Sequence, residues 1–220
     1  MERRLHVVVG HYGSGKTEFA INYAHALKKQ FQKVYIVDLD IVNPYFRTHD
    51  VKEALEKSGI TVIASPYASS NVDVPSLPAE VHRVFADIDA AVVFDVGGDD
   101  DGAIALGRYK RFFAEEEPEV LFVINRFRPL SSTCDQVVTL MKDIEAVSRL
   151  AVTGLVNSSN LAGLTTAGDV LSGQKLVDEV EKETGILCRY IAAMPSVLNE
   201  LPGSLSVKFF PIERFLALPF

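Results

Sequence analysis

The sequence predicts one α/β domain: a doubly wound, mostly parallel sheet of about seven strands with helices on both faces. Short apolar runs alternate with helical segments along the 220 residues, and most runs are hydrophobic at every position. Such runs are typical of strands covered on both faces, as in a parallel sheet. No linker, repeat or low-complexity tract interrupts the alternation, so we expect residues 1–220 to form a single domain.

The predicted strands are the apolar runs, of which Ala90-Ala91-Val92-Val93-Phe94 is typical. Parallel strands are connected by right-handed crossovers, so a helix should follow each run. Ligands of such folds bind at the carboxyl ends of the strands, and functional residues are therefore expected in the loops after the runs. The runs cover residues 5–10, 33–38, 60–64, 90–96, 119–125, 151–156 and 187–193.

The segments between the runs are the predicted helices. In the first, Phe19, Tyr23 and Leu27 recur at i, i+4 and i+8, which places them on one face of a helix. Gly59 and Gly185 follow two of the segments and suit the left-handed position after a helix. In chain order the segments are 17–31, 48–58, a short helix after Ser76, 101–116, 132–150 and 167–184.

The last segment, residues 204–220, is apolar and has Lys208, Glu213 and Arg214 as its charged members. Two cations and a helix-breaking Pro211 do not make the basic amphipathic helix of a membrane anchor. We expect this segment to pack on the domain as a final helix, or to form a dimer contact.

The composition excludes several classes of protein. A formal net charge of −7 argues against a surface that coats nucleic acid. Cys134 and Cys188 lack metal-type spacing, which argues against a zinc site or an iron–sulfur cluster, and scattered cysteines fit a reducing cytosol. The first apolar run is too short for a signal peptide, and no stretch is long enough to span a membrane. We expect a cytoplasmic protein.

A phosphate-binding pattern, G-x-x-x-x-G-K-[ST], lies between the first run and the first helix. Its glycines let successive main-chain N–H groups point at anionic oxygens, and the helix N-terminus adds partial positive charge. The strand before the loop and the helix after it disfavour a glycine turn that binds nothing. The sequence therefore predicts a nucleoside triphosphate site with Mg²⁺. The residues expected to contact the nucleotide are Gly10, His11, Tyr12, Gly13, Ser14, Gly15, Lys16, Thr17 and Glu18.

Acidic residues follow two other predicted strands. Asp38 and Asp40 end the second run, where a magnesium ion would relieve the repulsion between two carboxylates. Asp95 ends the fourth run and is followed by Gly97-Gly98, whose main chain could sense a γ-phosphate. The alternative is that these acids are solvated loop residues. The next acids, residues 99–101, fit a helix start better.

Three segments together resemble the ParA/MinD/CobQ group of P-loop ATPases: Gly13 to Thr17, Val37 to Asp40 and Phe94 to Gly98. The resemblance implies that Lys16 and Thr17 bind phosphate and Mg²⁺. It also implies that Asp38 assists the metal shell and that Asp95 is its outer-sphere acid. Asp40 would orient the attacking water, so that Lys16 and Asp40 would be the catalytic residues.

The resemblance also implies an adenine site. Family members contact adenine through an Asn at the end of a late strand and through the main chain after the next strand. Here those positions are Asn157 and the segment around Pro195, although Asn157 could equally be a turn residue without a ligand. The guanine-type N-K-x-D pattern is absent, which favours ATP over GTP.

One position departs from the family pattern. The family has an additional lysine at the start of the phosphate loop, which reaches the partner's phosphates in a nucleotide-sandwich dimer. This chain has His11 there, a residue that is largely neutral at pH 7 and could simply face solvent. Arg126 or Arg128, after the fifth run, could supply a replacement cation, or both could be surface residues.

Three functions remain open on the sequence alone. The leading one is an ATP-hydrolysing switch in which ATP and Mg²⁺ order the loops 40–48 and 97–102 and so change affinity for a protein partner. The others are an ATP-dependent kinase or ligase acting on a small molecule and a nucleotide-binding adaptor with little catalysis. A homodimer is compatible with each of them, and neither a membrane nor a nucleic-acid partner is indicated. The cations of residues 108–111 are expected to form a solvated helix face.

Overall fold

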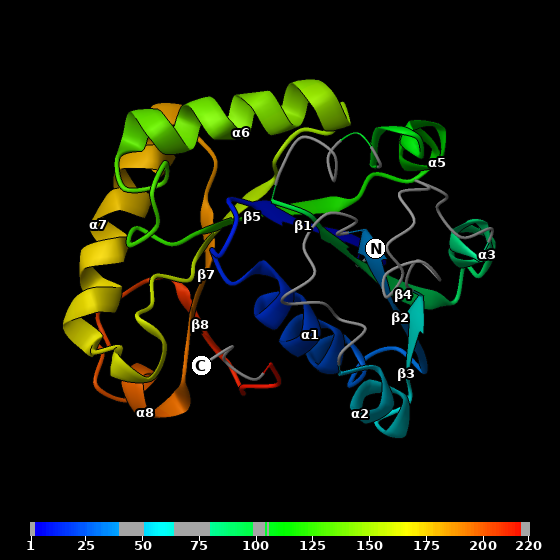
Figure 1. Ribbon diagram of the computed structural model, residues 1–220, viewed down its shortest axis with the longest axis horizontal. Coiled ribbons are helices and arrows are strands. Elements are labelled where there is room, and N and C mark those ends of the chain that lie inside the picture. Colours follow the sequence, from blue (N-terminus) through cyan, green and yellow to red (C-terminus); the bar gives the residue numbers. More distant parts are fainter. Residues whose placement is uncertain (1–2, 40–50, 64–79, 99–103, 105, 217–220) are drawn as a thin grey trace, which may run out of the picture.

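The computed structural model of the chain describes residues 3–39, 51–63, 80–98, 104 and 106–216. Strands and helices alternate as expected (Figure 1). The strands are β1 (Leu5–Gly10), β2 (Lys33–Leu39), β3 (Ile60–Ile63), β4 (Ala90–Val96), β5 (Glu119–Ile124), β6 (Gly154–Asn157), β7 (Cys188–Ala193) and β8 (Lys208–Pro211). The helices are α1 (Lys16–Leu27), α2 (Lys52–Lys57), α3 (Val81–Ala86), α5 (Lys110–Glu115), α6 (Cys134–Ser148), the 3-10 turn η2 (Ala162–Leu164), α7 (Ala167–Thr184) and α8 (Pro195–Leu198).

The strands form one sheet in the order β3-β2-β4-β1-β5-β6-β7-β8, and every neighbouring pair is parallel. The predicted fold class is confirmed, with eight strands in place of about seven. The chain moves outward from β1 to β2 and β3, and then returns across β1 to build the other half. This reversal places the switch in strand order at β1, where α/β folds bind their ligands.

Helices cover both faces of the sheet (Figure 1). Side chains from α1 and α2 pack with Val8, Ile36 and Val93 on one face. Side chains from α3, α5, α6 and α7 pack on the opposite face with Val7, Val37 and other alternate strand residues. Because both faces are buried, the central strands are apolar at nearly every position, as the sequence analysis expected.

Helix α1 is attached to the sheet by the stripe predicted from its spacing. Phe19, Tyr23 and Leu27 are all buried, and the rings of Phe19 and Tyr23 stack with their centroids 5.4 Å apart. Phe19 also packs against Phe210 of β8, at 5.2 Å between centroids. This aromatic contact fixes α1, and with it the loop that precedes α1, relative to the far half of the sheet.

The C-terminal segment differs from the predicted final helix. Residues Lys208–Pro211 form the edge strand β8, paired in parallel with β7. Pro211 accounts for the difference, because proline is excluded from a helix interior but tolerated on an edge strand. Beyond β8 the chain turns back onto α1, where the Asn22 side chain exchanges hydrogen bonds of 2.8 Å with the main chain of Glu213.

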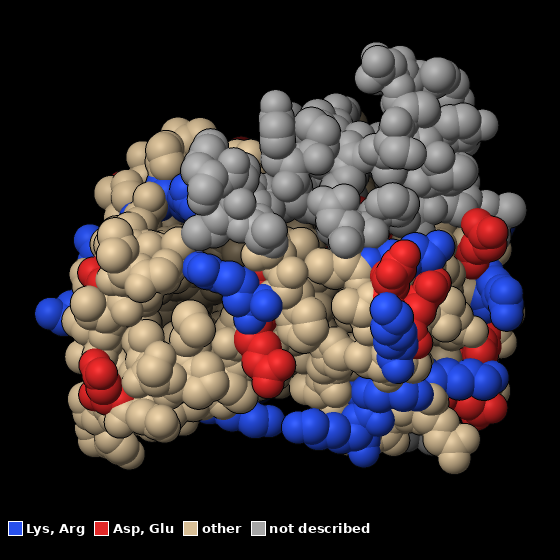
Figure 2. Space-filling view, turned by 60° about the horizontal axis from the view of Figure 1, so that its bottom comes forward, with Lys and Arg blue, Asp and Glu red and all other residues tan. Residues whose placement is uncertain are grey.

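No helix within the described part of the chain is both long and apolar enough to cross a membrane. On the face shown in Figure 2, lysine and arginine side chains lie among aspartate and glutamate side chains, without a continuous basic area over the described atoms.

Candidate functional site

The loop between β1 and α1 has the conformation that its glycines permit. Gly10, Gly13 and Gly15 have φ angles of 144°, 69° and 94°, which residues with a side chain rarely adopt. A Cβ at Gly10 would also overlap the carbonyl oxygen of Val123 on β5. The loop is closed by a 3.1 Å hydrogen bond from the main-chain N–H of Ser14 to the carbonyl of His11.

The interior of this loop suits an anion. Helix α1 begins at Lys16 without a side-chain cap, so its first N–H groups are directed at the loop. Lys16 is buried, and its Nζ donates a 2.9 Å hydrogen bond to the carbonyl of His11 across the loop. Ser14 Oγ is also buried, and among the described residues it has no hydrogen-bond partner. An ammonium group, main-chain donors and a hydroxyl therefore line one small space.

Asp38 and Asp95 meet beside the loop. They are register partners on β2 and β4, and Val8 of β1 is the partner of Asp95 on the other side. Because Ile36 and Val93 face α1, the residues two positions later also face α1, at the end of the sheet from which α1 starts. Both carboxylates are buried, with exposed fractions of 6% and 1%.

The residues present fit a magnesium ion. Mg²⁺ prefers hard oxygen ligands and is usually held by one or two carboxylates together with substrate phosphates and water. The Thr17 hydroxyl, in the first turn of α1, and the carboxylates of Asp38 and Asp95 are ligands of this type. Within the described ranges no three His, Cys, Asp or Glu side chains are grouped as a metal site.

Gly98, two residues after the end of β4, lies directly against the phosphate loop. A Cβ added at Gly98 would be 2.5 Å from the main-chain nitrogen of Tyr12 and 2.8 Å from Lys16 Nζ. Such distances are too short for any side chain, so only glycine fits this contact. Gly98 is therefore packed tightly against both the phosphate loop and Lys16.

The turn after β5 contains the two arginines considered as replacement cations, and the structure separates them. Arg128 Nε donates a 2.8 Å hydrogen bond to the carbonyl of Gly13 in the phosphate loop. Arg126 points elsewhere, because its Nη1 donates to the main-chain carbonyl and the hydroxyl of Ser172 on α7. Of these two cations, only Arg128 lies at the phosphate loop.

His11 is not equivalent to a lysine. Burial lowers its pKa, and the nearby charges of Lys16 and Arg128 lower it further, against an opposing effect of the hydrogen bond to the Tyr12 carbonyl. The imidazole is therefore neutral at pH 7.

Asn157 is the last residue of β6, and its amide is engaged inside the protein. Its Nδ2 donates to the carbonyl of Val170 at 3.1 Å and to Gln174 Oε1 at 3.0 Å, and its Oδ1 accepts from the N–H of Ser159. Both amide protons are thus used to attach α7 to the end of β6. In this conformation the side chain has no N–H left for a purine.

The residues after β6 do approach the phosphate loop. A Cβ at Gly15 would be 3.0 Å from Ser158 Oγ and 3.8 Å from Asn160 Nδ2. The sequence analysis did not identify Ser158 or Asn160. The available signal was the run of polar residues directly after β6, a strand that lies beside β5, the neighbour of β1.

Asn125, directly after β5, is a third residue that the sequence analysis did not identify. It is fully buried, and its Oδ1 accepts hydrogen bonds from the N–H groups of Phe127 and Asn160, at 3.1 and 3.3 Å. A side-chain oxygen that accepts from the N–H two residues later forms an Asx-turn, a local role that Asn commonly has. Asn125 therefore holds the turns after β5 and β6 together.

The remaining predicted residues either lie away from the interior of the phosphate loop or fall outside the residues that the structure describes. The Glu18 carboxylate accepts hydrogen bonds from the N–H groups of Phe215 and Leu216, and burial raises its pKa. Any contact of Glu18 with phosphate is thus left to its main-chain N–H. Pro195 is exposed at the start of α8, after β7, at the same edge of the sheet as the loop. Asp40 and the loops 40–48 and 99–102 lie outside the described residues.

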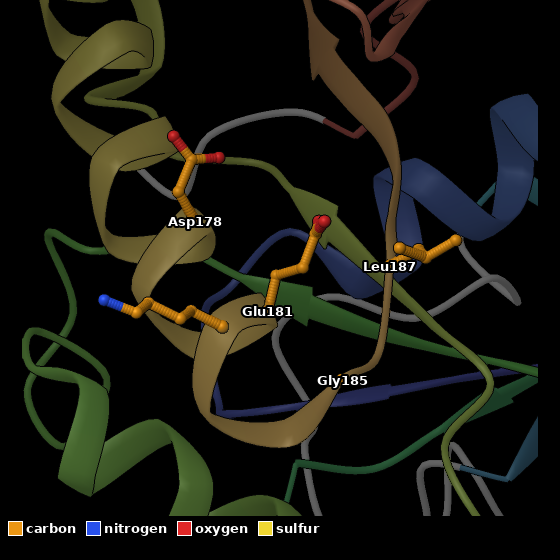
Figure 3. A pocket seen from close by; sticks show the side chains of 5 residues that line it. Asp178, Glu181, Gly185 and Leu187 are labelled. Carbon is orange, nitrogen blue, oxygen red and sulfur yellow. The ribbon is translucent and has the colours of Figure 1, made fainter.

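A cavity of about 340 Å³ lies elsewhere, between the end of α7 and the start of β7. Figure 3 shows Asp178 and Glu181 on the last turns of α7 beside this cavity. Its acidic lining disfavours a polyphosphate, and it lies at the amino end of β7, opposite to the edge that carries the phosphate loop. The Glu181 carboxylate accepts a 2.7 Å hydrogen bond from the N–H of Cys188, which indicates a structural role.

Comparison with solved structures identifies the fold. The cell division protein FtsY from Thermotoga maritima matches 88% of the chain with a TM-score of 0.58 at 19% identity, and the chain spans 63% of it. The signal recognition particle receptor FtsY from Elizabethkingia anophelis in complex with GDP matches 87%, with a TM-score of 0.54 at 19% identity; the chain spans 58% of that protein. A nucleotide-binding protein from Archaeoglobus fulgidus in complex with ADP matches 88%, with a TM-score of 0.52 at 17% identity, and 83% of it is spanned.

The chain therefore has the α/β fold of these proteins, a P-loop NTPase-like fold. At these identities the likeness concerns the fold, and the neighbours differ in the base of their bound nucleotide. No protein-family model matches the chain, and no curated protein does.

Proposed function

We propose that this protein is a Mg²⁺-dependent ATPase that acts as a nucleotide-driven switch of the ParA/MinD type. The observation that carries the proposal is the contact of Gly98 with Tyr12 and Lys16. Through this contact Gly98 would respond to occupation of the phosphate loop. Residues that pack on a loop holding the γ-phosphate are the usual means by which such proteins report hydrolysis.

The chemistry follows from positioning and charge, because phosphoryl transfer needs little covalent participation from the protein. The Lys16 ammonium and the N–H groups of the loop hold the phosphates, and Asp40 orients the attacking water. When bound, Mg²⁺ neutralises charge on the phosphate oxygens, and Thr17, Asp38 and Asp95 are the residues that would hold it. The role of Asp40 rests on the family resemblance.

We propose ATP as the nucleotide because the chain lacks the N-K-x-D pattern that would accept the protons of guanine. Since the Asn157 amide protons are engaged by α7, we assign adenine contacts first to the main chain around Pro195. Competition of ATP, GTP and CTP for a fluorescent ATP analogue tests the base. Displacement by GTP at lower concentration than by ATP would overturn this choice.

The activity is tested with ATP labelled at the γ-phosphate. Release of the label as free phosphate that requires Mg²⁺ supports the switch. Transfer of the label to an added metabolite would instead show a kinase or ligase, and tightly bound, unchanged ATP would show an adaptor. A turnover rate per molecule that rises with protein concentration, together with ATP-dependent dimerisation, would indicate a dimer-dependent ATPase cycle like that of ParA and MinD.

Two variants test the assigned roles of Lys16 and Asp40. Lys16→Ala should abolish ATP binding, whereas Lys29→Ala, exposed just beyond the other end of α1, should bind normally. Asp40→Ala should bind ATP but lose hydrolysis. Unchanged ATP affinity in Lys16→Ala would remove the phosphate loop from the mechanism, and normal hydrolysis by Asp40→Ala would remove Asp40.

A further inference from the structure

We propose that Arg128 contacts the nucleotide phosphates from within the same chain and supplies the positive charge that the family obtains from its additional lysine. The inference rests on the proposed function, and it concerns a residue that the family pattern does not contain. It also predicts that hydrolysis does not depend on a cation from a second copy of the chain.

The position of Arg128 is the first step. Its Nε lies 2.8 Å from the carbonyl oxygen of Gly13, and a Cβ at Gly13 would be 3.2 Å from Nε and 3.4 Å from Cζ. The guanidinium therefore packs against the main chain of the phosphate loop, where a side chain at position 13 would exclude it. Its bond to Gly13 uses only Nε, and the described residues provide no partner for the two terminal nitrogens. A guanidinium has five N–H donors, so four are available for phosphate oxygens.

The turn that carries Arg128 is fixed by hydrogen bonds to the main chain of Asn125. The N–H of Arg128 donates to the carbonyl of Asn125 at 3.1 Å, and the buried hydroxyl of Ser131 donates to the same carbonyl at 2.8 Å. The Asn125 side chain in turn joins this turn to the one after β6. The main chain that carries Arg128 is therefore fixed, and the bond from Nε to Gly13 directs the exposed side chain to the phosphate loop, which lowers the conformational freedom lost on binding phosphate.

The local charge supports the same role. His11 occupies the place of the family's lysine but is neutral at pH 7, whereas a guanidinium is always charged. The charge of Arg128 contributes, after burial and the charge of Lys16, to the lowered pKa of His11. Without Arg128, Lys16 would be the only permanent side-chain cation that the described residues place at the phosphate loop. A cation supplied within the chain is known to accelerate P-loop enzymes by about 10³–10⁵-fold.

A merely structural role is the alternative, in which Arg128 only supports the loop through Gly13. The two roles differ in their dependence on the γ-phosphate. A support for the loop would affect ATP and ADP binding equally. A cation that contacts the γ-phosphate would affect ATP more than ADP, and hydrolysis most of all.

Arg126 provides a matched control. It has the same charge, lies two residues away on the same turn, and is attached to Ser172 on α7. We would measure the dissociation constants of ATP and ADP and the single-turnover rate at saturating ATP for the full-length protein. The proteins compared are the parent chain, Arg128→Gln, Arg128→Lys, Arg128→Ala and Arg126→Gln, each checked for an unchanged circular dichroism spectrum.

We expect Arg128→Gln to lower the rate by at least about 100-fold and to weaken ATP binding by at least about tenfold more than ADP binding. Arg128→Lys should recover part of the rate, since it restores the charge but not the planar fork. Added guanidinium ion at millimolar concentration should partly restore hydrolysis in Arg128→Ala. Arg126→Gln should stay within about threefold of the parent chain.

The outcomes separate this inference from the proposed function. A parent chain that binds no nucleotide would overturn the proposed function itself. If the parent chain hydrolyses ATP and Arg128→Gln does so within about threefold, the inference alone is wrong. It is also wrong if ATP and ADP affinities fall equally, if Arg126→Gln is equally impaired, or if guanidinium ion has no effect. Should the parent chain bind ATP without hydrolysing it, the ratio of ATP to ADP affinity decides the question.

Discussion

Asp38 and Asp95 are directly paired across β2 and β4, and both carboxylates are buried on the face of the sheet that α1 covers. Like charges at paired positions repel unless a cation lies between or beside them. In this protein the pair adjoins the strand that leads into the phosphate loop. A magnesium ion bound at this edge of the sheet would offset that repulsion.

The first prediction concerns magnesium. Adding Mg²⁺ to the ATP-bound protein should raise its melting temperature, and Asp38→Asn or Asp95→Asn should remove most of that increase. A ligand present at about 100 times its dissociation constant stabilises by about 2.7 kcal/mol, or roughly 5–10 °C for a chain of this length. Scanning calorimetry with ATP in Mg²⁺ and in EDTA measures the difference. Asp178→Asn, at the cavity by α7, is the control and should keep the full increase.

The second prediction concerns the contact between the loops after β1 and β4. Gly98→Ala should lower the melting temperature of the nucleotide-free protein, because its methyl group would overlap the main chain of Tyr12. Overpacking typically costs about 1–3 kcal/mol, equivalent to about 2–12 °C here. Gly203→Ala is the control, since a Cβ there meets no atom within 4 Å. Equal melting temperatures for the two variants would contradict the packing of Gly98.

The phosphate loop and the alternation of strands with helices could be predicted because each is encoded locally. A glycine-rich loop between an apolar run and a helix is rarely found without a phosphate ligand, and apolar strands alternating with helices leave a parallel sheet as the simplest solution. The prediction that Phe19, Tyr23 and Leu27 share one face of a helix is confirmed for the same reason, since it depends only on helical periodicity.

What could not be predicted depends on contacts between distant parts of the chain. Arg126 and Arg128 lie on one turn, and only the tertiary structure shows that one reaches α7 and the other the phosphate loop. The amide of Asn157 is engaged by α7 residues that lie 13 and 17 positions away. Edge strand β8 was missed because its four residues form a strand only by pairing with β7.

The third prediction uses the lowered pKa of His11, which leaves the imidazole neutral above pH 6.5. Bound triphosphate adds negative charge beside the ring and so raises its pKa. A ligand that raises a pKa binds more tightly when the group is protonated, and ATP affinity should therefore increase as the pH falls from 8 to 6. One added charge at about 4 Å in a watery site is worth about 1 kcal/mol, so the increase is at most about fivefold and is complete only below the pKa of His11 in the nucleotide-free protein.

The control for His11 removes the titration of ATP itself. His11→Gln should show the same pH dependence as the parent chain except that it lacks this increase, because the titration of the γ-phosphate is common to both proteins. Isothermal titration calorimetry at pH 6, 7 and 8 gives the comparison. Parallel curves for the two proteins would show that the imidazole does not respond to the phosphates.

The fourth prediction concerns Cys134, the first residue of α6. A cysteine at a helix N-terminus normally has a lowered pKa, yet burial and then the hydrogen bond to the Glu183 carboxylate raise the pKa of this thiol to about 11. Thiolate is the reactive form, so alkylation by iodoacetamide at pH 8 should be slow. Glu183→Gln removes the negative charge and should accelerate the alkylation of Cys134 several-fold. Cys188, whose pKa burial raises to about 11, is the internal control and should react at an unchanged rate. Peptide mapping by mass spectrometry follows both thiols in one sample, and equal acceleration at both would show that Glu183→Gln loosens the fold and does not act on Cys134 through charge.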